Sequence, residues 1–312
     1  ELAAVAKARA DKRRTRILSS EAAEAAASEY SEADFIVAED AYVIVTEQGW
    51  VKRQQSVKDL ASTRVKQGDR VLACEAGSTR ATLGFFSNKG VCYVCRIADI
   101  PPSTGYGDPI QKLFKLGDGA RVVGVVSFDG RRIDVPDQDL VYDDGTPFPP
   151  YGVAVTRRGL AFRFPLFGHR EPSNRNGRKF GRLNEGDEIL RVFVQGVDLD
   201  TGFDETGFII VAATDGHALS LGLDELPVLS GPGKGNTLIK LADDAEVLAA
   251  RTTPSPRANP LTVYTEKGKK YDLFVEAIAG NRGGRGRPVV KRTGFADFEQ
   301  IEPEVPRLEE DE

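Results

Sequence analysis

Methionine is absent from the 312 residues, and cysteine, histidine and tryptophan are scarce, at 3, 2 and 1 residues. The missing initiator methionine suggests a piece of a longer chain. Three cysteines without a secretory signal do not make a disulfide scaffold, so a reducing cytoplasm is expected. No Ser-His-Asp arrangement or carboxylate pair stands out, and histidine and cysteine are too few for a typical zinc site. We therefore predict no catalytic residue, no metal ligand and no cofactor within this chain.

Long apolar runs are also lacking. A membrane-spanning helix needs about 20 consecutive apolar residues. The clean apolar runs here are short, as in Phe208–Ala213, which excludes a helical membrane protein. Hydrophobic residues nevertheless make up 40% of the chain, so it is not disordered as a whole.

The net charge of -5, from 42 Lys+Arg and 47 Asp+Glu, as an average argues against a nucleic-acid partner. The charges are unevenly placed, however. Glu302–Glu312 alone carries six acids and one arginine, a net of -5, so the preceding residues sum to zero. Within that neutral body, Arg157–Arg182 holds eight Lys/Arg and one Glu, and Arg282–Arg292 holds five positive charges and no acid. Such asymmetry is typical of nucleic-acid contact.

Short runs rich in Val, Ile, Phe and Tyr, separated by glycine-containing turns, fill the chain from Phe35 to Ile301. This texture is typical of strands and tight turns. One unit recurs: a hydrophobic strand, a polar turn that ends in glycine, and a second strand. The turn glycines are Gly49, Gly90, Gly159, Gly216 and Gly268. Because glycine adopts positive φ without strain, we predict five hairpins.

A further strand follows most of these hairpins through a Gly-Asp or Asp-Asp step, as at Gly186-Asp187. The spacing suggests about four strands per repeat. Five such repeats predict an all-β, five-bladed propeller, which leaves few free sheet edges. A sixth, degenerate blade in the acidic insertion Asp129–Pro150 is the alternative. We expect three parts: residues 1–34 as the end of a coiled coil with a short helical linker, 35–301 as the propeller, and 302–312 as an acidic tail.

Two stretches carry a family resemblance. Gly49-Trp50-Val51-Lys52-Arg53 after a Val-Ile-Val-Thr strand resembles the first repeat of the C-terminal domain of the A subunit of bacterial type IIA topoisomerases, DNA gyrase and DNA topoisomerase IV. Asp11-Lys12-Arg13-Arg14-Thr15-Arg16-Ile17 resembles the end of that family's breakage-reunion region. The resemblance implies a β-pinwheel whose rim binds and bends double-stranded DNA.

The same resemblance implies an accessory domain without chemistry of its own, because the family's catalytic tyrosine lies upstream. Its implied partners are the N-terminal breakage-reunion region of the same polypeptide and the ATPase (B) component of the full heterotetramer. The full enzyme is expected to use ATP and Mg in the bacterial, nucleoid-associated cytoplasm. Gyrase carries a box like Gln-Arg-Arg-Gly-Gly-Lys-Gly in its first repeat. Ala61–Asp69 has no Gly-Gly pair there, which resembles topoisomerase IV.

Two alternatives to a topoisomerase IV-like domain stay open. One is a gyrase domain that wraps DNA for negative supercoiling. The string Gly280–Arg287 resembles topoisomerase IV, but it is box-like although displaced and so leaves this alternative open. The other is a propeller that serves as a protein-interaction scaffold. A wrapping surface needs many Lys/Arg along a face, and guanidinium groups match phosphate geometry. The residues that we predict to contact DNA are Lys52, Arg53, Arg157, Arg158, Arg163, Arg170, Arg175, Arg178, Lys179, Arg182, Lys234, Lys269, Lys270, Arg282, Arg285 and Arg287.

Overall fold

The computed structural model describes residues 35–195, 197–198, 202–203, 207–290 and 293–308. The chain divides into two compact units, Glu1–Val37 and Ala38–Glu312. The helical linker that we predict over residues 1–34 lies outside the described residues. The strands of the described residues belong to the second unit. Within the described residues, no helix is long and apolar enough to cross a membrane.

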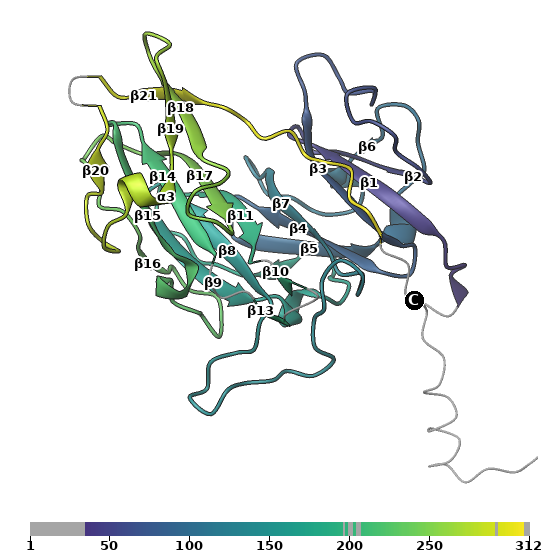
Figure 1. Ribbon diagram of the computed structural model, residues 1–312. Coiled ribbons are helices and arrows are strands. Elements are labelled where there is room, and N and C mark those ends of the chain that lie inside the picture. The colour runs from purple at the N-terminus through teal and green to yellow at the C-terminus, as the bar shows by residue number, and fades with distance from the viewer. Residues whose placement is uncertain (1–34, 196, 199–201, 204–206, 291–292, 309–312) are drawn as a thin grey trace, which may run out of the picture. The chain divides into compact units, whose positions relative to one another are not determined.

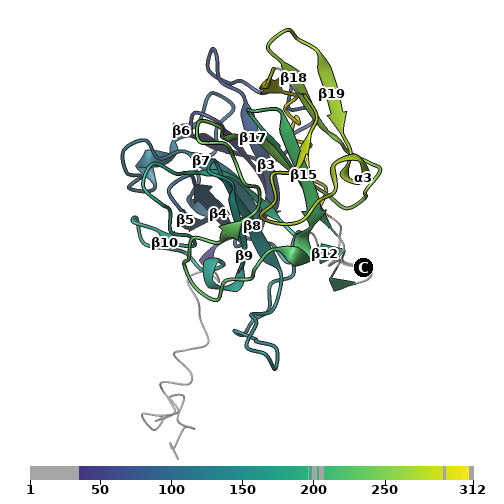
Figure 2. The same ribbon diagram turned by 90° about the vertical axis from the view of Figure 1, so that its left-hand side faces the viewer.

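Antiparallel strands form five main sheets in the described second unit (Figures 1 and 2). The first sheet has the order β3 (Val71–Ser78), β1 (Asp40–Thr46), β2 (Trp50–Gln54), β6 (Asp108–Pro109). The second is β7 (Val122–Ser127), β4 (Thr82–Ser87), β5 (Val91–Arg96), β10 (Arg178–Lys179). The third is β11 (Ile189–Val194), β8 (Tyr151–Thr156), β9 (Leu160–Pro165), β16 (Asn236–Thr237).

The fourth sheet has the order β17 (Val247–Thr253), β14 (Phe208–Ala213), β15 (His217–Gly222), β20 (Arg287–Pro288). The fifth has only three strands, β21 (Phe295–Phe298), β18 (Leu261–Thr265) and β19 (Lys270–Leu273). A separate two-stranded ladder pairs β12 (Val197–Asp198) with β13 (Gly202–Phe203). The described helices are single turns: η2 (Ile97–Asp99), η3 (Ile110–Lys112), η4 (Phe167–His169), η5 (Leu223–Glu225) and α3 (Val275–Ile278).

The five predicted hairpins are confirmed. Each turn glycine has a positive φ, from 73° at Gly90 to 84° at Gly216. The Gly-Asp steps also have a structural role, because the Asp187 carboxylate accepts the backbone N–H of Arg158 in the hairpin turn at 3.0 Å. The sixth-blade alternative is wrong, since Asp129–Pro150 contains an isolated bridge but no sheet.

The outermost strand of each of the first four sheets is contributed by the next repeat along the chain. Each contributed segment begins at a glycine with positive φ and, three residues later, reaches an apolar residue. The four segments begin at Gly107, Gly177, Gly235 and Gly286. The backbone N–H groups of Ile110, Phe180, Leu238 and Val289 donate to the carbonyls of Gly49, Gly90, Gly159 and Gly216. We call these four stretches the exchange segments.

Glycine is required at the start of an exchange segment for two reasons. At Gly177, φ is 71°, a conformation that other residues rarely adopt. A Cβ atom there would also lie 2.7 Å from the carbonyl oxygen of Cys92 in the accepting strand. At the corresponding place, the first repeat has Asp59-Leu60-Ala61-Ser62, with Asp59 where the glycine would be and Ser62 where the large apolar residue would be. These four residues form no strand.

The hydrophobic core is divided among the interfaces between consecutive sheets. Phe85 faces the first sheet and Phe86 faces the third, because neighbouring residues on a strand point to opposite faces. Cys95 and Cys92 divide between the same two interfaces, because residues three apart on a strand also point to opposite faces. Two further core clusters lie between the third and fourth sheets and between the fourth and fifth. Both faces of the central sheets are therefore apolar.

The C-terminal segment beyond β21 lies against the first repeat. Residues 300–305 and the loop around Leu60 line one cavity together. Pro306 is buried, and the Arg132 guanidinium donates to the Arg307 carbonyl at 3.4 Å. Part of the predicted acidic tail thus has defined contacts, whereas residues 309–312 lie outside the described residues.

Candidate nucleic-acid interface

A basic residue occupies the same position in four repeats. Arg64, Lys115, Arg182 and Lys240 each lie two residues before the β-turn that leads into the repeat's inner strand. All four are exposed, and each is followed by Val or Leu. The equivalent residue of the fifth repeat, Lys291, lies outside the described residues. A Lys or Arg therefore recurs at equivalent positions of successive repeats, and the fold gives each one an equivalent place before the turn.

Three of these residues are fixed by backbone hydrogen bonds to the next repeat, at the residue two positions before its exchange segment begins. Lys115 N–H donates to the carbonyl of Arg175 at 2.7 Å. Arg182 N–H donates to Gly233 and Lys240 N–H donates to Gly284, both at 2.8 Å. These bonds thus join the second, third, fourth and fifth repeats in sequence.

Exposed basic side chains follow this connected line of backbone, and we call them the basic stripe. Its members are Lys115, Arg175, Lys179, Arg182, Lys234, Lys240, Arg282, Arg285 and Arg287. One of them, Arg285, has a carboxylate nearby, with Asp215 at 3.9 Å. The side chains of Lys115, Lys179, Arg182, Lys234 and Lys240 make no hydrogen bond or ion pair with any described residue. These cations are available to an external anion.

Seven of the predicted DNA contacts belong to the stripe: Arg175, Lys179, Arg182, Lys234, Arg282, Arg285 and Arg287. The structure brings these together from the third, fourth and fifth repeats. Lys115 and Lys240 are stripe members that the sequence reasoning missed. A signal for them exists, because a Lys-Leu or Arg-Leu pair precedes the turn in three repeats, at Lys115, Arg182 and Lys240.

Lys52 is wrong as a surface contact. The residue is 1% exposed, and its Nζ donates to the carbonyls of Arg64 and Gly105 at 2.8 Å each. Burial, together with the nearby Arg64, lowers the pKa of Lys52. The ammonium group holds two loops of the first sheet together and cannot reach a phosphate.

Four predicted arginines serve the fold, because their guanidinium groups already donate to backbone carbonyls. Arg53 donates to Ile100 and Arg163 to Leu226, each at 3.0 Å. Arg178 donates to the carbonyls of Glu171 and Pro172 at 2.7 Å. Arg170 donates to the Pro136 carbonyl at 2.7 Å and to Asp137 at 3.0 Å. These four side chains are also half-buried, so releasing them is costly, and we remove them from the candidate interface. Arg175 and Arg287 donate to the carbonyls of Lys112 and Ala279 at 3.3 and 3.1 Å, but they are exposed and stay in the stripe.

Lys269 and Lys270 on the fifth sheet also lie apart from the stripe. The Lys270 ammonium is 3.6 Å from both Asp272 and Glu299. Lys269 lies over the ring of Tyr271, 4.8 Å from its centroid. The acids beside Lys270 offset its charge, so this pair offers a weaker attraction to phosphate than the stripe.

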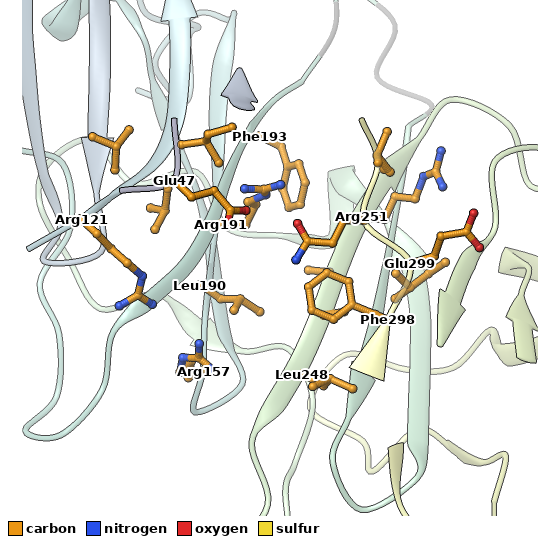
Figure 3. A pocket seen from close by; sticks show the side chains of 18 of the residues that line it. Glu47, Arg121, Arg157, Leu190, Arg191, Phe193, Leu248, Arg251, Phe298 and Glu299 are labelled. Atoms are coloured by element: carbon orange, nitrogen blue, oxygen red, sulfur yellow. The ribbon is translucent and has the colours of Figure 1, made fainter. Parts of the chain in front are cut away.

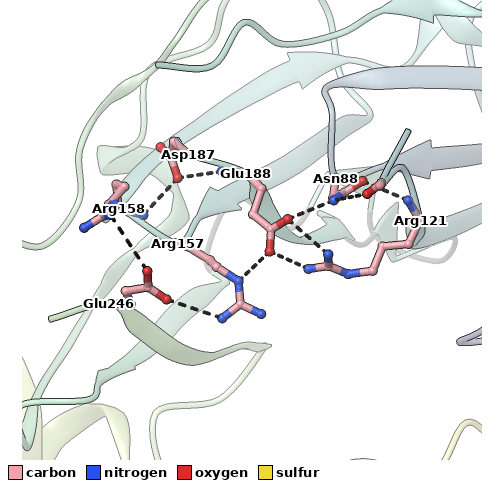
Figure 4. A network of polar contacts seen from close by, with 8 residues as sticks. Asn88, Arg121, Arg157, Arg158, Asp187, Glu188 and Glu246 are labelled. Carbon is pink, nitrogen blue, oxygen red and sulfur yellow. Dashed lines mark hydrogen bonds and ion pairs between the residues drawn. The ribbon is translucent and has the colours of Figure 1, made fainter. Parts of the chain in front are cut away.

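Arg157 and Arg158 belong to a polar network between repeats (Figure 4). Glu188 accepts hydrogen bonds from Arg121 and Arg157, both at 2.6 Å, and from Asn88 at 2.9 Å. Glu246 lies 3.8 Å from Arg157 and 4.0 Å from Arg158. The pKa of Glu188 is lowered to about 2, mainly by the hydrogen bond from Arg121. The hydrogen bonds from Asn88 and Arg157 lower it further.

The Glu188 network predicts a pH-dependent stability. A folded-state pKa of about 2, below the ordinary 4.5, adds stability above pH 4.5 that is lost as the pH falls toward 2. We expect Glu188→Gln to unfold at lower denaturant than the wild type at pH 6, and the difference to shrink by pH 3. Glu246→Gln, whose contacts are longer, is the control. A wild-type advantage over Glu188→Gln that is equal at both pH values would contradict this assignment.

Comparisons with known proteins agree on one family. Residues 85–129, 153–195 and 208–254 match the family model described as DNA gyrase C-terminal domain, beta-propeller. The A subunit of DNA topoisomerase 4 from Escherichia coli (strain K12) is 26% identical over 313 residues, covering 98% of this chain and 37% of that protein. The A subunit of DNA gyrase from Aminobacterium colombiense is 27% identical over 277 residues, covering 84% of this chain and 30% of that protein.

Solved structures share the fold. The C-terminal domain of DNA topoisomerase IV superposes with a TM-score of 0.69 at 19% identity, covering 85% of this chain and 78% of that one. The E. coli ParC C-terminal domain gives 0.63 at 20% identity, covering 84% and 98%. The chain spans little more than a third of the length of the topoisomerase polypeptides that it matches. Its second, third and fourth repeats therefore match the β-propeller C-terminal domain family of the DNA gyrase A subunit, and the chain as a whole is similar to the A subunits of DNA topoisomerase IV and DNA gyrase.

Proposed function

We propose that the basic stripe binds the phosphate backbone of double-stranded DNA. The observation that carries this proposal is the run of unpaired cations at equivalent positions of successive repeats, joined by the hydrogen bonds of Lys115, Arg182 and Lys240. Duplex DNA presents phosphates at regular intervals, so a repeating row of cations fits it without reading bases. Five stripe members have no competing partner among the described residues, so contact with phosphate requires no existing bond to be broken.

The domain acts as an accessory module of a type IIA topoisomerase, and it grips and bends a duplex segment for strand passage by the catalytic core. The catalytic tyrosine is expected in the upstream breakage-reunion region of the same polypeptide. The ATPase (B) component and the use of ATP and Mg are expected of the whole enzyme, in the nucleoid-associated cytoplasm of a bacterium.

A topoisomerase IV-like role is favoured over gyrase-like wrapping. Residues 59–62 of the first repeat lack the features of an exchange segment, and Ala61–Asp69 lacks a Gly-Gly pair. The glycine- and arginine-rich string Gly280–Arg287 instead leads into β20 of the fourth sheet. Ligation of nicked circular DNA in the presence of the protein distinguishes the two roles. Little change of linking number, with binding retained, supports the topoisomerase IV-like role, and a strong positive shift supports gyrase-like wrapping.

Fluorescence anisotropy with a labelled duplex tests DNA binding itself. We expect the logarithm of the association constant to fall linearly with the logarithm of salt concentration, by about 0.9 per phosphate neutralised. Affinity should be nearly equal for duplexes of unrelated sequence, because phosphate contacts carry no sequence information. Binding that is indifferent to salt between dilute and physiological concentrations would rule out the stripe as the interface.

A protein-interaction scaffold is the second candidate, and one feature favours it. The insertion between the second and third sheets exposes Leu140, Val141 and Tyr142, which are 42%, 57% and 39% exposed. Asp143 and Asp144 follow directly and are also exposed. An apolar tip among acids suits a basic protein surface better than DNA. In that role, Val141→Ser weakens protein association and leaves duplex binding unchanged.

A further inference from the structure

A cavity of about 420 Å³ lies where the inner strands of all five sheets meet (Figure 3). Leu72 of β3, Val123 of β7, Arg191 of β11, Ala250 of β17 and Phe298 of β21 contribute to its lining. Its volume is within the range of sites that bind small molecules. The stripe residues named above are not among those that line it, so the cavity is separate from the proposed DNA interface.

Apolar and aromatic side chains form much of the wall. Phe193 and Phe298 lie on different strands and both border the cavity (Figure 3). Leu190 and Leu248 extend this apolar surface. A wall of this kind suits a ligand that has a planar or apolar part as well as a polar one.

Most of the charged groups in the wall already have partners. Arg121 and Arg157 are bound to Glu188, and the Arg251 guanidinium donates to the Pro260 carbonyl at 2.8 Å. Among the acids, Glu47 pairs with Arg70 at 2.7 Å and Glu299 lies 3.6 Å from Lys270. These five side chains therefore already have hydrogen-bond or ion-pair partners within the protein and do not need a ligand to provide one.

Two charged groups of the wall are exceptions. The Oδ2 atom of Asp69 is buried without a hydrogen-bond partner among the described residues, and the unpartnered cation of the wall is Arg191. It has no hydrogen bond and no ion pair within 4.0 Å to any described residue, although its side chain borders the cavity and is partly buried. Burial lowers the pKa of Arg191, while the nearby Glu47 opposes that effect. A guanidinium group that has lost part of its water and gained no acceptor is destabilising.

We propose that the central cavity binds a small phosphorylated molecule, whose phosphate accepts hydrogen bonds from Arg191 and whose planar part packs against Phe193 and Phe298. The guanidinium fork matches two phosphate oxygens, which makes arginine well suited to this contact. Because the wall is built from all five sheets, the ligand stabilises the assembled propeller against unfolding. This site is independent of DNA binding.

Thermal unfolding with adenosine monophosphate and pyrophosphate, at an ionic strength held constant with sodium chloride, tests the site. We expect the wild-type midpoint to rise and saturate with adenosine monophosphate, to rise less with pyrophosphate, and not to change with adenosine. Arg191→Gln should lose the shift, and titration calorimetry should give a dissociation constant weaker by about tenfold or more, the loss expected for a charge-assisted contact. Arg191→Lys, which keeps the charge but not the fork, should fall between.

Arg182→Gln combined with Lys240→Gln is the matched control, because it removes two cations from the stripe and none from the cavity. It should keep the full adenosine monophosphate shift. The proposal is overturned if no phosphate compound raises the wild-type midpoint, or if the Arg191 variants respond as the wild type does. A shift that is lost in the stripe control would instead place anion binding on the stripe. Arg191→Lys keeps the experiment decisive if Arg191→Gln folds poorly.

Discussion

Replacing Arg182 and Lys240 together by glutamine is expected to lower the affinity for duplex DNA by about a hundredfold at low salt, if each lost phosphate contact costs about tenfold. Both side chains are exposed and have no partner among the described residues, so their removal disturbs no internal contact. Their positions are fixed by backbone bonds to Gly233 and Gly284, which the substitutions leave in place. The loss of affinity therefore measures the phosphate contacts of these two side chains and not a change in the stability of the fold.

The slope of the salt dependence should fall by about 1.8 in the same variant, because each phosphate contact contributes about 0.9. Anisotropy titrations over a series of salt concentrations measure both quantities. The matched control is Lys58→Gln combined with Lys267→Gln, which changes the net charge equally at exposed positions off the stripe. An equal loss in the control would mean that affinity follows total charge, and the stripe would have no special part in binding.

The hairpins were predictable from sequence because their turns depend on single residues. A tight turn at Gly159, where φ is 81°, needs a glycine whatever the surrounding structure. The third strand of the repeat was also predictable, since a short run rich in Val, Leu and Ile follows each Gly-Asp or Asp-Asp step. The outermost strands were not, because each has only two residues, as in β10, and a run that short has no period to recognise.

The candidate interface was predictable only in part, for a related reason. Charge density marked the segment from Arg157 to Arg182, but the sequence does not say which guanidinium groups are already occupied. Arg163 donates to the Leu226 carbonyl, 63 residues further along the chain, and such a partner has no local signature. Lys52 lies in the motif that carries the family resemblance, yet it is buried under the loop of Arg64. The local sequence thus shows where the basic residues are concentrated. Tertiary contacts determine which of their side chains remain available to an external anion.

The exchange segments predict that Phe180→Ala destabilises the domain by about 3–5 kcal/mol, the usual cost of removing a buried phenylalanine. Phe180 comes from the third repeat but is 2% exposed within the core between the second and third sheets. Its ring centroid lies 5.2 Å from that of Phe86 and 4.8 Å from that of Phe164. Chemical denaturation measures the loss, and a change below about 1 kcal/mol, which is typical of surface positions, would show that this segment does not hold the two repeats together.

Phe162→Ala removes a ring from the same core cluster, but from strand β9 inside its own repeat, and is the matched control. Both variants should lose stability to a similar degree. Only Phe180→Ala should increase hydrogen exchange selectively at the amides of β10, because Phe180 follows this two-residue strand directly and anchors it. The same change should weaken duplex binding although it removes no charge, since Arg175, Lys179 and Arg182 are positioned by this segment. Phe162→Ala should leave duplex binding close to that of the wild type under conditions in which both variants are folded.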